Sequence, residues 1–91
     1  MSQLNDILTE RGARYGTFAG QAEISQHLKR VVRGYLDKRG KTLADDQMEA
    51  VEMICHKLAR AINGDADYDD HWTDVAGYAQ LVSDRLQGSL R

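Results

Sequence analysis

Apolar side chains recur at three- and four-residue intervals along most of the chain, and this spacing predicts helices rather than strands. The first predicted helix spans about residues 2–12, with Ser2 as a candidate N-cap. The second spans residues 17–37 and carries a broad apolar stripe, and residues 14–16 are expected to connect the two helices. The first half of the chain is therefore predicted to be a pair of helices.

Two more helices are predicted in the second half. The third opens at Thr42, a candidate N-cap, and stops at Asn63-Gly64, while the fourth starts near Asp69 or Asp70 and ends by Gly88. The stripes expected to face the core are Ala44, Met48, Val51, Cys55, Leu58 and Ile62 on the third helix, and Trp72, Val75, Ala76, Ala79, Val82 and Leu86 on the fourth. The chain is predicted to be a single all-α domain over residues 1–91, a compact four-helix bundle-like fold.

Composition narrows the class of protein. A chain of 91 residues and 10.2 kDa has room for one domain, and its core is thin because so short a chain buries little surface. No apolar run is long enough to cross a membrane, and a single cysteine, Cys55, cannot form an internal disulfide, which favours a cytoplasmic protein. A net charge of −2 argues against a dedicated nucleic-acid binder.

The charges are segregated along the chain. Residues 29–41 are strongly basic, whereas residues 45–52 and 65–74 carry acidic side chains without a base. These segments are expected either to pair across the bundle or to stay solvated. We also expect a functional site among these basic and acidic segments.

Acidic side chains on the last two helices suggest a magnesium site. Glu49 and Glu52 share a polar face of the third helix, and converging carboxylates are the ligands that Mg²⁺ prefers. Asp70 and Asp74 lie four residues apart on a helix and repel each other unless a cation lies between them. That cation is Lys57, Arg60, a basic side chain of the second helix, or a metal. The alternative for the first pair is an ordinary solvated helix face.

A second surface is predicted from side chains that do not fit a solvated helix. Met53 projects from the polar face of the third helix, and Gly77 and Leu81 lie on the fourth helix opposite its apolar stripe. A glycine inside a helix is unfavourable unless something approaches the backbone closely. A second protein surface explains these positions, either from another part of this chain or from a second copy, and we expect a homo-oligomer that completes the core.

The remaining candidates are a basic–aromatic turn and isolated histidine and cysteine side chains. Arg11, Arg14 and Tyr15 form a turn that could hold a phosphate and stack a base. The three histidines lack zinc-ligand spacing, and Cys55 lies on the apolar stripe, where an unreactive core residue is expected.

Two stretches of the chain resemble a family of small, largely uncharacterised phage and prophage proteins. Residues 7–16 resemble its opening ILxERGxRYG, and residues 49–81 resemble its second half, with the pattern KxARxxxGD followed by DxWxDxAGYA. This family has a broader similarity to the all-α MazG-like nucleotide pyrophosphohydrolases. In those enzymes, helices supply an EExxE group and a later ExxD group that hold magnesium on a nucleoside triphosphate, and subunits assemble to complete the site.

The resemblance implies a nucleotide site with departures from the enzyme pattern. Glu49 and Glu52 match part of the first acidic group, but position 48 is methionine. The later group would be Asp70 and Asp74, which is one residue too long and lacks the glutamate. These departures count against hydrolysis and leave binding of a nucleotide or phosphate ligand possible.

We therefore expect a protein that binds a nucleotide or another phosphate-bearing ligand in a MazG-like layout, in the cytoplasm of a host cell if it is phage-encoded. The expected ligand contacts are Arg14, Tyr15, Lys57 and Arg60, and the expected magnesium ligands are Glu49, Glu52, Asp70 and Asp74. One alternative is an active magnesium-dependent nucleoside triphosphate pyrophosphohydrolase. Another is a non-enzymatic module that inhibits a host protein or sequesters a host nucleotide signal. A purely structural bundle, in which these charges merely pair, is the third.

Overall fold

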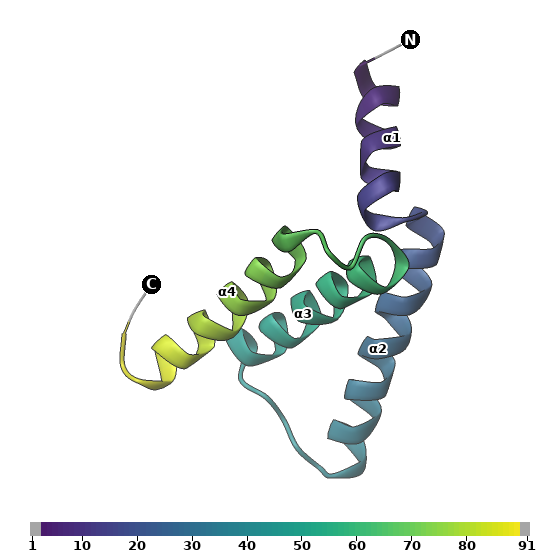
Figure 1. The fold of residues 1–91 in the computed structure, drawn as a ribbon. Coiled ribbons are helices and arrows are strands. Elements are labelled where there is room, and N and C mark those ends of the chain that lie inside the picture. Colours follow the sequence, from purple (N-terminus) through teal and green to yellow (C-terminus); the bar gives the residue numbers. More distant parts are fainter. Residues whose placement is uncertain (1–2, 90–91) are drawn as a thin grey trace.

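The computed structural model describes residues 3–89, which form four helices (Figure 1). Their bounds are α1 Gln3–Tyr15, α2 Phe18–Lys38, α3 Asp45–Asn63 and α4 Asp69–Leu86. This part of the chain contains no strand. The all-helical prediction with four helices is confirmed.

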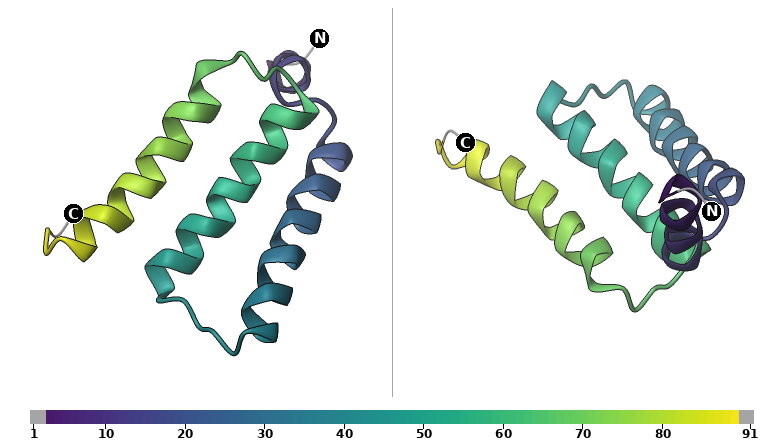
Figure 2. Two further views of the ribbon diagram at one scale, coloured as in Figure 1. Left: turned by 60° about the horizontal axis from the view of Figure 1, so that its bottom comes forward. Right: turned by 90° about the horizontal axis from the view of Figure 1, so that it is seen from above.

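Helix α3 is the centre of the fold. It packs against both α2 and α4, whereas α2 and α4 do not contact each other. The three helices therefore lie side by side with bundle-like packing, and α1 is seen nearly end-on when that layer is viewed flat (Figure 2). Helix α1 packs mainly against α2 and α3, at the end of the layer from which it projects.

Most helix ends follow the predicted signals. The hydroxyl of Thr17 accepts a hydrogen bond from the amide of Gly20 at 3.1 Å and so caps α2. Helix α3 ends at Asn63 with Gly64 following, as predicted. The candidate cap Ser2 lies outside the described residues.

Two predicted boundaries are wrong. Helix α1 continues to Tyr15, so only Gly16 and Thr17 connect it to α2. Thr42 lies in a loop, and α3 begins at Asp45 after Ala44, whose amide donates to the Gln47 side chain at 3.0 Å. That side chain satisfies a backbone donor at the helix start and makes a threonine cap unnecessary.

The core is built from small side chains. Its buried apolar members are Ala50, Cys55, Ala59 and Ala61, all on α3. Burial of Cys55 was expected, and it raises the pKa of the thiol, which keeps the sulfur protonated and unreactive. No large side chain is fully buried in the described part of the chain.

The predicted core stripe of α4 is wrong for most of its members. Trp72, Ala76, Ala79 and Leu86 are exposed, and the buried residues of α4 are His71 and Asp84. The reason is that α3 is the only helix packed along α4, so most of the surface of α4 that faces away from α3 is uncovered. Ile62, predicted to face the core from α3, is 65% exposed.

Candidate ligand-binding site

The end of α1 is fastened to the end of α3 by backbone contacts. The Asn63 side-chain amide donates to the carbonyl oxygens of Tyr15 and Thr17, both at 2.8 Å, and the backbone amide of Asp65 donates to the carbonyl of Arg14 at 2.8 Å. Gly16 has φ +75°, and a Cβ at this position would collide with Asn63. We call these contacts the Asn63 clasp.

Two arginines stack on two tyrosines around this clasp. The guanidinium carbon of Arg60 lies 4.3 Å from the ring centre of Tyr15, and that of Arg14 lies 4.2 Å from the ring centre of Tyr68. His71, which is buried, packs against both tyrosine rings. The two stretches that carry the family resemblance therefore meet in space and form one structural junction.

A cleft of about 410 Å³ opens beside this junction, between α1, the start of α2 and α3. Its cationic and polar lining comes from Arg11, Gln21, His56 and Arg60. The other described lining residues are Leu8, Gly12, Tyr15, Gly16, Thr17 and Phe18, so no carboxylate lines the cleft. The cleft combines a positive wall with aromatic surfaces.

The electrostatics of the cleft favour an anion. Burial is the main cause that lowers the pKa of His56, and the positive charges of Arg60, Lys57 and Lys29 lower it further. The Gln21 side-chain amide lies 3.4 Å from the His56 ring. The Nε of Arg60 is buried and makes no hydrogen bond to any described residue.

The four predicted ligand residues divide into two groups. Arg14, Tyr15 and Arg60 gather at the junction, and Tyr15 and Arg60 line the cleft. Lys57 faces α4 instead and forms an ion pair with Asp74 at 2.7 Å. Lys57, one of the cations predicted to lie beside Asp70 and Asp74, thus pairs with Asp74.

Three of the four predicted magnesium ligands make separate contacts with other side chains. Glu52 pairs with Arg33 of α2, Asp74 pairs with Lys57, and Asp70 accepts a hydrogen bond from the Tyr68 hydroxyl at 2.7 Å. That hydrogen bond is the main cause that raises the pKa of Tyr68. Glu49 is exposed on the first half of α3.

These carboxylates are separated because α2 and α4 lie on different sides of α3, so Glu52 and Asp74 point to different neighbours. Within residues 3–89 no group of three or more His, Cys, Asp or Glu side chains is placed to hold a metal ion. The magnesium site stays a prediction from the sequence, and the described residues add nothing to it.

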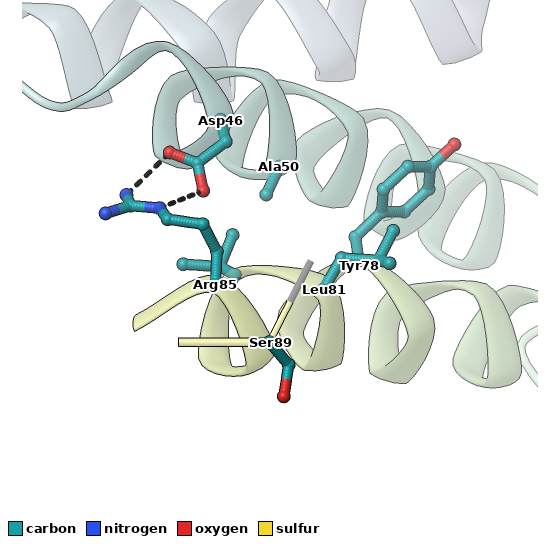
Figure 3. A pocket seen from close by; sticks show the side chains of 7 residues that line it. Asp46, Ala50, Tyr78, Leu81, Arg85 and Ser89 are labelled. Carbon is teal, nitrogen blue, oxygen red and sulfur yellow. Dashed lines mark hydrogen bonds and ion pairs between the residues drawn. The ribbon is translucent and has the colours of Figure 1, made fainter. Parts of the chain in front are cut away.

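A smaller hollow of about 220 Å³ lies between the first half of α3 and the second half of α4 (Figure 3). The Asp46 carboxylate and the Arg85 guanidinium face each other there and form two hydrogen bonds of 2.7 and 2.8 Å. This contact is the main cause that lowers the pKa of Asp46. Because the guanidinium is occupied by the carboxylate, this hollow is less suited to an anion than the α1–α2–α3 cleft.

The family profile of a domain of unknown function, DUF6378, matches residues 2–86. The chain belongs to the DUF6378 family. No curated protein and no solved structure matches this DUF6378 chain. None of the helices of the DUF6378 domain described by the structure is long and apolar enough to cross a membrane.

Sequence reasoning missed part of the cleft in this DUF6378 domain. Gln21 and Phe18 come from the start of α2, which carried no functional signal, and His56 is one of the three histidines, which were considered only as zinc ligands. The one available signal was the basic–aromatic segment of residues 11–15, which was predicted to be a turn but forms the end of helix α1. It could have pointed to a cleft, but its counterpart on α3 depends on how the helices pack.

Proposed function

We propose that this protein binds a phosphate-bearing small molecule, such as a nucleotide, in the α1–α2–α3 cleft. The observation that carries the proposal is the lining of the cleft, where Arg11, Arg60 and His56 meet and no described lining residue is acidic. Guanidinium groups match the geometry of phosphate oxygens and bind them with charge-assisted hydrogen bonds.

The size and the aromatic surfaces of the cleft support the same function. A volume of about 410 Å³ falls within the range of small-molecule sites. Tyr15 and Phe18 offer flat apolar surfaces beside the cations, and Phe18 is 80% exposed. A phosphate near the cations and a base on an aromatic ring would use both parts of the cleft.

Binding without catalysis is the form of this function that the geometry supports best. The catalytic alternative, a magnesium-dependent pyrophosphohydrolase acting through Glu49, Glu52, Asp70 and Asp74, gains no support because three of these carboxylates already contact other side chains. A non-enzymatic module that sequesters a nucleotide signal needs only the cleft. We also propose, as the sequence predicts, that the protein acts as a homo-oligomer.

The test measures binding and turnover on the same samples. Calorimetric titration with pyrophosphate and with nucleoside triphosphates, with and without magnesium, is compared with an assay for released pyrophosphate. Arg11 is the residue to change because it is exposed and lines the cleft, and Arg11→Gln is expected to weaken binding at least about tenfold, the usual effect of losing a charged hydrogen bond. Arg30→Gln, which changes an exposed arginine of α2 outside the cleft, is the matched control.

Different results would overturn different parts of the proposal. An absence of binding to every phosphate compound, or equal losses in Arg11→Gln and Arg30→Gln, would exclude this cleft as the site. Magnesium-dependent turnover that is lost in Glu52→Gln but kept in Arg33→Gln would establish the enzyme instead. The Arg33 variant breaks the same ion pair and leaves the carboxylate in place.

A further inference from the structure

The layer of α2, α3 and α4 has two broad sides, and α1 lies on only one of them. On α3, Asp46 and Lys57 point to α4, while Glu52 points to α2 on the nearly opposite side of the helix. Between these two directions, the surface of α3 has two strips, one on each side of the layer. Arg60 lies on one of them, where it contacts Tyr15 of α1. The other strip of α3 faces away from α1.

Most of that other strip is aliphatic. Its aliphatic members are Val51, Ile54, Leu58 and Ile62, spaced by three, four and four residues, and the polar Gln47 lies on the same strip one turn before Val51. By the same helical geometry, the exposed side chains that flank this strip are Val31 and Tyr35 on α2 and Trp72 and Leu86 on α4. We call the strip and these four flanking side chains the open apolar face.

The chain exposes more surface than a compact monomer of its mass. The accessible surface is 6555 Å², whereas a compact monomer of this mass exposes about 5300 Å². The radius of gyration is 15.5 Å, compared with about 12 Å for a compact domain of this length. Part of the excess comes from α1, and the total excess of roughly 1200 Å² is larger than the about 800 Å² that each partner contributes to a stable interface.

The charges of the outer helices indicate what covers the face. Residues 18–41, which include α2, carry a net charge of +4, and residues 65–86, which include α4, carry −5. Because α3 separates α2 from α4, these charges do not neutralise each other within the chain. A second copy that placed α2 on α2 would bring like charges together, whereas α2 on α4 brings unlike charges together.

We propose that two copies pack through their open apolar faces, with α3 near the centre and α2 of each copy against α4 of the other. This surface differs from Met53, Gly77 and Leu81, the positions from which the sequence predicted an oligomer. The α1–α2–α3 cleft lies on the opposite side of the layer, so both clefts of the dimer stay open. The proposal specifies the surface of the proposed homo-oligomer, and it does not rest on ligand binding in the cleft.

The experiment uses the single tryptophan of the chain as a probe of the face itself. Sedimentation equilibrium is expected to give about twice the monomer mass of 10.2 kDa. Trp72 is 48% exposed in the isolated chain, so dimerisation should shift its emission to shorter wavelength and reduce its quenching by acrylamide as the concentration rises. A dimer that forms through another surface would leave the Trp72 emission unchanged, and this result would overturn the proposal.

Two exposed positions provide matched variants. Ile62→Glu places a charge on the open apolar face, and Leu4→Glu places one on α1 at a similarly exposed side chain, so neither change disturbs the buried core. We expect Ile62→Glu to raise the dimer dissociation constant at least about tenfold and Leu4→Glu to leave it unchanged. A strictly monomeric wild-type protein, a dimer that survives Ile62→Glu, or a dimer that Leu4→Glu disrupts would each contradict this arrangement.

Discussion

Asn63 is the residue on which the position of α1 depends most. Its side-chain amide donates to two backbone carbonyls in the connection between α1 and α2, and no other described side chain bridges these helices in this way. In the sequence, Asn63 is only the last residue of α3, and Asn63-Gly64 is a common helix C-terminus. Its structural role comes from the packing of α1 beside it.

We expect Asn63→Asp to destabilise the protein by about 1–3 kcal/mol, because a carboxylate has the shape of the amide but cannot donate either hydrogen bond. Urea denaturation followed by circular dichroism measures the change. Gln26→Glu makes the same chemical change at an exposed position of α2 and is expected to have little effect. Equal midpoints for the two variants would show that the clasp does not stabilise the fold.

At the scale of the helices, glycines of similar appearance in the sequence have opposite roles. Gly16 has φ +75° and lies against Asn63, so it helps to fix the angle between α1 and α2. Gly34 lies inside α2 with open space around the position of a Cβ. The sequence gives no means of distinguishing these roles, because close approach of a distant segment leaves no local pattern.

We expect Gly16→Ala to destabilise the fold by more than about 1 kcal/mol and Gly34→Ala to stabilise it by up to about 1 kcal/mol. The alanine at position 16 meets both an unfavourable backbone conformation and a collision with Asn63, whereas the alanine at position 34 meets neither. Thermal unfolding of the two variants beside the wild type measures both effects. A stabilising Gly16→Ala would contradict the close contact.

The positions of the helices could be predicted from the sequence, but the side that each helix buries could be predicted only in part. The spacing of apolar residues located four helices, and Cys55 was correctly assigned to the core. The stripe of α4 from Trp72 to Leu86 is as apolar as a core stripe but is mostly exposed, because hydrophobic periodicity does not show which neighbour covers a face. The residues of the cleft could also be predicted only in part. Arg11 and Tyr15 lie close together in the sequence and formed a local signal, whereas His56 reaches the cleft only through helix packing.

At the scale of the whole molecule, two ion pairs join α4 to α3, and acid should weaken both. Lys57 lowers the pKa of Asp74 and Arg85 lowers the pKa of Asp46, in each case mainly through a side-chain hydrogen bond. A carboxyl whose pKa is lower in the folded chain stabilises the fold above its unfolded pKa, near 3.8, and loses that contribution as the pH falls through its folded value.

We therefore expect the double variant Asp46→Asn and Asp74→Asn to be less stable than the wild type at neutral pH and to match it more closely below about pH 3. Urea midpoints measured between about pH 7 and about pH 2 test this dependence. The control is the double variant Glu23→Gln and Asp37→Asn, which removes two exposed acids of α2. A stability difference between wild type and the first variant that does not shrink in acid would rule out the ion pairs as its cause.

The Asn63 clasp also bears on the order in which the helices can pack during synthesis. Residues of α1 emerge from the ribosome before the groups that hold α1, since Asn63 and Asp65 follow about fifty positions later. A helix of 13 residues is only marginally stable alone in water. Helix α1 is thus synthesised well before it can dock, and any fragment that ends before Asn63 lacks the contacts that fix α1.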